Sequence, residues 1–94
     1  MRVRVTYDAG ATVVDEIFTG ATAEEVVAAM QKEVASKMSF LVRAFVMGMS
    51  PTEFAQEVIS RYNLAAKKSL TPPQNCDEFL EQGIAEGIAT VVEP

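Results

Sequence analysis

The spacing of hydrophobic positions changes along the chain, and the first pattern is that of a strand pair. Apolar and polar residues alternate from Met1 to Tyr7, which is the period of a strand with one buried face. Asp8–Gly10 fits a three-residue hairpin loop. β-Branched and aromatic residues over 11–19 predict a second strand. Its apolar residues occur in adjacent pairs around Asp15, which indicates either a bulge there or partial cover on both faces.

A helical period replaces the alternation after Thr22, which forms a capping box with Glu25. Apolar residues then recur every three or four positions: Val27, Met30, Val34, Met38, Leu41 and Phe45. One straight helix over 23–47 would be roughly 37 Å long at about 1.5 Å per residue, which is long for a domain of this size. We therefore predict a long first helix that is bent or broken near Ser36–Ser39, where serines compete for backbone hydrogen bonds. A strand over 40–46 is the alternative.

The most apolar stretch, Met38–Met49, is predicted to be the core of the protein. With Arg43 in its middle it is too short and too charged to cross a bilayer, which requires roughly 20 apolar residues. Leu41 and Phe45 are expected to face the strands, and the helices that follow are expected to cover the other side. Arg43 should then meet a carboxylate or several carbonyls, because a dry environment does not tolerate an unpaired charge.

The remaining pattern predicts two more helices and a strand. Ser50–Glu53 combines a capping box with a proline at the first helical position, and Asn63 offers an end to that helix, unless residues 64–68 prolong it. Asn75 caps a third helix, and residues 88–93 form a strand that pairs with the hairpin. The sequence thus predicts a single α+β domain over 1–94, with a hairpin, three helices and a C-terminal strand completing a three-stranded sheet.

The composition of the chain disfavours several classes of ligand and of catalysis. The formal net charge of −5 disfavours a nucleic-acid backbone as the main ligand. The absence of His removes the commonest general base and metal ligand, and the glycines form no phosphate-binding pattern. Cys76 is the only cysteine, and its acidic neighbours oppose a thiolate. We therefore expect a cytoplasmic, non-catalytic protein without metal or cofactor and without membrane contact.

Three adjacent carboxylate pairs keep one enzymatic alternative open: Asp15-Glu16, Glu24-Glu25 and Asp77-Glu78. Adjacent side chains point apart on a strand and diverge on a helix, and acids are also favoured in the first turn of a helix. A solvent-facing or capping role explains the pairs better. A small enzyme that uses carboxylates in a cleft remains the second alternative function.

Residues 40–63 carry a partial resemblance to a helix-turn-helix unit. Ala44, Gly48 and Phe54 have the spacing of the small residue, the turn glycine and the apolar residue of that motif. The resemblance implies a DNA-binding regulator in which Arg61 contacts the nucleic acid. Glu57 would also face the phosphates, and a capped helical hairpin without DNA function explains the same residues.

The amount of apolar surface predicts self-association. The three strands and the short helices do not supply enough surface to cover the whole stretch 38–49, and a three-stranded sheet leaves two open edges. A second copy is the simplest cover, because closed two-fold pairs are the commonest oligomers. We therefore expect a binding or assembly module acting as a homodimer, with another protein as a possible partner. The candidate interface residues are Phe40, Arg43, Val46 and Met47.

Overall fold

The computed structural model describes residues 1–8 and 13–94, and most of the predicted hairpin loop lies outside these residues. The described part confirms the α+β class but contains four helices where three were predicted. The elements are β1 (Arg2–Asp8), β2 (Val13–Thr19), α1 (Ala23–Ser36), α2 (Phe40–Met47), α3 (Pro51–Ala66), α4 (Cys76–Ala85) and β3 (Ala89–Glu93). The first helix is broken and not merely bent, at the predicted position between Ser36 and Phe40. The alternative of a strand over 40–46 is wrong.

The sheet is antiparallel in the order β2-β1-β3, so the C-terminal strand pairs with the first strand as predicted. The β1–β2 register continues without a shift from Arg2↔Thr19 to Asp8↔Val13. A bulge near Asp15 is therefore wrong. The other interpretation, partial cover on both faces, is wrong as well, because Phe18 is half-buried on the inner face while Ile17 is 45% exposed on the outer face.

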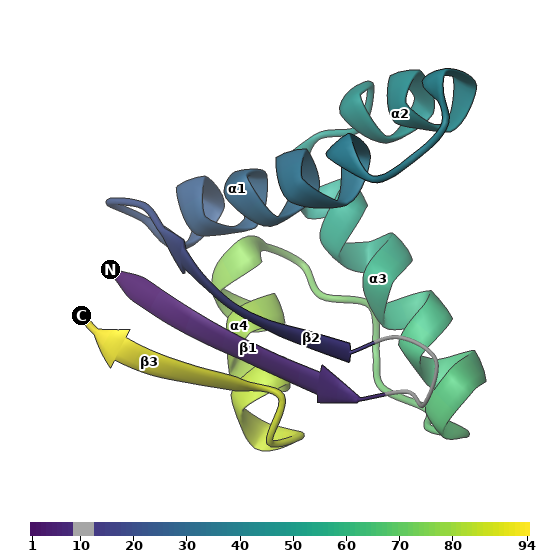
Figure 1. Cartoon of the computed structure of the whole chain (residues 1–94). Helices are drawn as coiled ribbons and strands as arrows, with labels where there is room; N and C mark the ends of the chain where they lie inside the picture. The colour runs from purple at the N-terminus through teal and green to yellow at the C-terminus, as the bar shows by residue number, and fades with distance from the viewer. Residues whose placement is uncertain (9–12) are drawn as a thin grey trace.

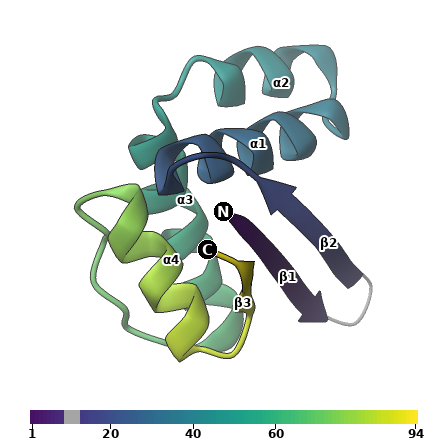
Figure 2. The same ribbon diagram turned by 90° about the vertical axis from the view of Figure 1, so that its left-hand side faces the viewer.

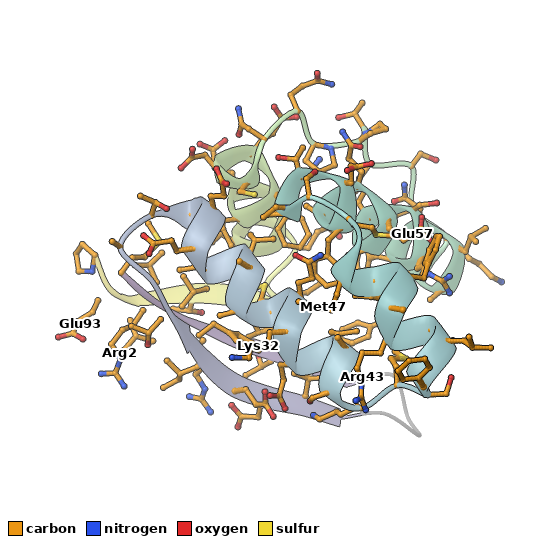
Figure 3. All side chains as sticks on the ribbon, turned by 90° about the horizontal axis from the view of Figure 1, so that it is seen from above. Arg2, Lys32, Arg43, Met47, Glu57 and Glu93 are labelled. Carbon is orange, nitrogen blue, oxygen red and sulfur yellow. The ribbon has the colours of Figure 1, made fainter. Side chains whose placement is uncertain are left out.

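The outer face of the sheet is polar and open to solvent. Arg4 binds Asp15 through two hydrogen bonds of 2.9 Å, and Arg2 reaches Glu93 across the β1–β3 pair at 3.2 Å (Figure 3). Exposed ion pairs of this kind contribute little to stability. They do mark this face as solvated, so the helices cover only the opposite face.

The helix starts follow the predicted caps. Each cap side chain accepts a hydrogen bond from the backbone N–H three residues on, which satisfies a donor that has no partner within the helix. The pairs are Thr22–Glu25 at 3.2 Å, Ser50–Glu53 at 3.1 Å and Asn75–Glu78 at 2.8 Å. At Ser50 the capping box is complete, because the carboxylate of Glu53 also accepts from the Ser50 N–H.

Two helix ends differ from the simplest expectation. Helix α3 continues past Asn63 and ends at Lys67, which takes the left-handed conformation with φ 56°. The Asn63 side chain instead forms two hydrogen bonds with the backbone of Leu70, at 2.9 and 3.0 Å. Helix α4 passes through Gly83, and Gly87 with φ 77° leads the chain into β3. A side chain at Gly83 would crowd Ala89, since its Cβ would lie 3.2 Å from that of Ala89.

The helices form layers, and the core therefore lies largely outside the predicted stretch, residues 38–49. Helices α1 and α4 pack on the sheet, and α2 lies on the far side of α1 (Figures 1 and 2). The core forms where the inner face of the sheet meets α1, α3 and α4, and includes Val3, Val26, Val27, Phe54 and Leu80. The prediction that residues 38–49 form the core is wrong, because the break after Ser36 turns α2 away from the sheet.

Candidate functional site

Helix α2 presents most of its apolar side chains to solvent. Phe40 is 78% exposed, Leu41 79%, Phe45 68% and Met47 51%. We call these four residues the α2 surface. Since an aromatic side chain alone offers about 150–250 Å², the four together expose on the order of 500 Å² of apolar area, near the upper size of the largest patch on a typical monomer.

Helix α2 depends on the rest of the protein for its stability. It has eight residues, and isolated helices of that length are marginal in water. Its first residue lacks a side-chain cap, because Ser39 makes no capping hydrogen bond. Val46 is its only buried residue. Polar contacts with α1 must therefore supply much of what holds α2 in place.

Gln31 of α1 provides the first of these contacts. Its side chain is buried, with only 4% of the residue exposed. Its Nε2 donates to the carbonyl oxygen of Val46 at 2.7 Å and to that of Met49 at 2.9 Å. These carbonyls lie at and just after the C-terminal end of α2, where backbone acceptors have fewer helical partners; the Val46 carbonyl also accepts from the Met49 N–H at 3.2 Å. One buried amide thus fixes the end of α2 to the middle of α1.

Arg43 provides the second contact. Its guanidinium donates to the carbonyl of Ala35 at 3.2 Å and to that of Met38 at 3.3 Å, and Figure 3 places it where the end of α1 meets α2. The negative end of the α1 dipole favours a cation at this position. The prediction that Arg43 meets several carbonyls is confirmed. The predicted two-sided burial around it is wrong, because Arg43 itself is exposed.

The predicted interface residues do not share one environment. Phe40 and Met47 belong to the α2 surface, whereas the Arg43 side chain binds the carbonyls of Ala35 and Met38. Val46 is 9% exposed and belongs to the core cluster, so its side chain is not available to a partner without rearrangement.

The structural role of Gln31 was not predicted from the sequence. Its signal was its place in the row Val27, Gln31, Ala35, where residues four apart share one helix face. All three are buried. A polar residue within a buried row needs a polar partner, so the row itself pointed to a buried hydrogen bond.

The groove between α2 and α3 is where the helix-turn-helix interpretation would place its packed interface. Ala44 borders this groove and is exposed, whereas Phe54 is buried in the core. Glu53 and Glu57 also line the groove. Arg61, the predicted nucleic-acid contact, binds Glu57 through its Nε at 3.0 Å. The charge around the groove is thus opposite to what a phosphate backbone requires.

The remaining chemically reactive side chains are either buried or paired with a cation. Cys76 is buried, and burial raises the pKa of its thiol, which disfavours the nucleophilic thiolate. The hydrogen bonds from Arg4 lower the pKa of the Asp15 carboxyl, and Glu16 faces Lys37 at 3.5 Å. Among the side chains that the structure describes, no three acidic or thiol groups gather closely enough to hold a metal ion.

No family model matches the chain, and no significant match is found among curated proteins or solved structures. In the part of the chain that the structure describes, no helix has the length and apolar character needed to cross a membrane. Function is therefore inferred from the side chains and their geometry.

Proposed function

We propose that this protein is a non-catalytic binding module that forms a two-fold homodimer through the α2 surface. The observation that carries the proposal is the exposure of Phe40, Leu41, Phe45 and Met47 on one short helix. Gln31 holds the C-terminal end of that helix by its backbone, and the Arg43 side chain ties the helix to the carbonyls of Ala35 and Met38, so the four apolar side chains remain outward. Such a patch is characteristic of a contact surface.

The size of the patch is sufficient for a specific contact between two copies. Two α2 surfaces together would remove about 1,000 Å² of apolar area from water, close to the lower limit for specific interfaces. Burial of this area supplies the hydrophobic driving force for association, which is set against the loss of translational and rotational freedom and the ordering of side chains at the contact. Packing α2 against its symmetry copy also places the same residues on both sides of the axis.

Light scattering after gel filtration at micromolar concentration tests the proposal. The expected mass is twice the 10.2 kDa of the chain. Leu41→Glu should return the mass to that of a monomer, because it places a charge at the centre of a dry contact. Leu64→Glu is the matched control, since Leu64 is 82% exposed and Leu41 is 79% exposed, but Leu64 lies on α3. A wild-type mass of 10.2 kDa would refute the proposal.

A DNA-binding regulator is the alternative function, with Arg61 as its candidate contact. The net charge of −5, the pairing of Arg61 with Glu57 and the acidic lining of the α2–α3 groove all oppose it. We therefore propose that nucleic acid is not the main partner. Titration with labelled duplex DNA at low salt checks this, and no saturable binding is expected. Submicromolar binding that weakens steeply with salt and disappears in Arg61→Ala would favour the alternative.

A further inference from the structure

The sheet and α3 leave a space between them. Helix α1 packs on β2, α4 packs on β3, and α3 packs on α1 and α4. Between α3 and the inner face of the sheet lies a cavity of about 490 Å³. Packed protein interiors contain few voids larger than a water molecule, whereas small-molecule sites typically measure about 300–1,000 Å³. The volume of this cavity is that of a binding site.

The lining of the cavity is almost entirely apolar. Val5 and Phe18 of the sheet form one side, and Val58 of α3 and Phe79 of α4 form parts of the others. Most lining residues are buried or half-buried, while Arg61 and Ala65 are exposed. The cavity is therefore bounded by strands and helices on several sides and opens to solvent along α3.

Aromatic and polar groups gather at one part of the lining. The rings of Tyr7 and Tyr62 meet edge to face, with centroids 6.1 Å apart, and so bridge β1 and α3. The Tyr62 hydroxyl donates to Glu86 at 2.8 Å. Lys68 lies 3.4 Å from the same carboxylate, whose side chain is only 18% exposed. Glu86 thus presents a partly shielded acceptor beside the apolar space.

Gln82 supplies a second acceptor at the cavity wall. Its Nε2 donates to the carbonyl of Thr71 at 2.7 Å, which fixes the orientation of the amide. Its Oε1 is buried and has no hydrogen-bond partner among the described residues. A buried acceptor without a donor is costly. Because Gln82 lines the cavity, a ligand hydroxyl there would supply the missing donor once the side chain turns its Oε1, which solvent does not reach, toward the space.

We propose that this cavity binds an uncharged, apolar small molecule that carries one hydroxyl group. The apolar body occupies the space between the sheet and α3, and the hydroxyl donates to Gln82. A carboxylate at the same place would lose its hydration in an apolar space, which is costly for a charge that gains no partner. The nearby cations do not supply one, because Lys68 is already paired with Glu86 and Arg61 with Glu57.

Titration of the ¹⁵N-labelled protein with 1-decanol, followed by amide chemical shifts, tests the proposal. Saturable shifts are expected at cavity residues such as Val58 and Gly83. The methyl ether of decanol, which has no donor, should bind about fivefold more weakly, as expected for the loss of one hydrogen bond. Decanoate should bind more weakly still. Shifts confined to α2, equal affinity for all three probes, or tighter binding of decanoate would overturn the proposal.

Two variants separate binding from folding. Val58→Phe should fill part of the cavity, abolish the decanol shifts and leave the unfolding free energy equal or higher, because it replaces empty space with contacts. Gln82→Met should retain decanol binding but remove the preference for decanol over its methyl ether. Unchanged decanol affinity in a folded Val58→Phe protein would contradict the proposed location. The chemical shifts of cavity residues should not change when the protein is diluted in the absence of a probe. If they do change, a second copy of the chain occupies the cavity.

Discussion

Replacing Gln31 with Met is expected to loosen α2 from the rest of the protein. Methionine nearly preserves the volume of the side chain but removes the Nε2 donor that binds the carbonyls of Val46 and Met49. Each lost hydrogen bond removes about 0.5–1.5 kcal/mol. The Val46 carbonyl keeps the backbone N–H of Met49 as a donor at 3.2 Å, and the Met49 carbonyl is only partly buried, so neither is left wholly without a partner. The expected destabilisation is therefore about 1–3 kcal/mol, a sizeable share of the roughly 5–15 kcal/mol that stabilises a typical domain.

Urea unfolding followed by circular dichroism measures this loss. Lys32→Met is the matched control, because it introduces the same residue one position further along α1 at an exposed site, where surface substitutions change stability by about 0.5 kcal/mol or less. Limited proteolysis should also cut the 37–50 segment faster in Gln31→Met than in the control. If both variants unfold at the same urea concentration, Gln31 does not hold α2 in place.

Three further predictions follow from individual contacts. Arg43→Met should cost only about 1 kcal/mol in urea unfolding, because Arg43 is exposed and water can replace it at the exposed Met38 carbonyl and in part at the carbonyl of Ala35; a clearly larger loss would contradict this exposure. The hydrogen bond from Tyr62 lowers the pKa of Glu86 below its ordinary value of 4.5. The stability that this bond contributes is therefore present above pH 4.5 and is lost as the pH falls through the lowered pKa. Tyr62→Phe should flatten the acid side of the plot of stability against pH, and an unchanged plot would refute the coupling. Cys76 should react with a thiol reagent much more slowly in the native protein than in urea, because burial raises its pKa; equal rates would show that the thiol is accessible.

Local signals in the sequence predicted the elements well. The capping box at Ser50–Glu53 and the cap at Asn75 use side chains that act within three residues, so neighbouring sequence suffices to find them. The break between Ser36 and Ser39 was also visible, from the length of the periodic stretch and its serines. The α+β arrangement of hairpin, helices and closing strand follows from these local patterns.

The placement of the apolar faces was not predictable in the same way. Periodicity groups Val34, Leu41 and Phe45 on one face of a continuous helix, but the break rotates and displaces the second half. Val34 packs against the core, while Leu41 and Phe45 face solvent. Periodicity identifies a face but does not show whether another element covers it.

The polar contacts that define the two proposed sites link residues far apart in the chain. Gln31 binds backbone 15 and 18 residues away, and Tyr62 binds Glu86 at a separation of 24. No pattern of residue types at such distances specifies which polar pairs will meet. The cavity between α3 and the sheet is equally a product of how whole elements pack.

Contact between two α2 surfaces is tested most directly by isotope-filtered NOE spectroscopy on a mixture of ¹³C-labelled and unlabelled protein. Only contacts between different molecules give signals in this experiment. A symmetric dimer through α2 predicts intermolecular signals between the Met47 methyl group and the rings of Phe40 and Phe45, and their loss in Leu41→Glu but not in Leu64→Glu. Intermolecular signals that arise only from the sheet edges, or no intermolecular signals at all, would contradict the role proposed for the α2 surface.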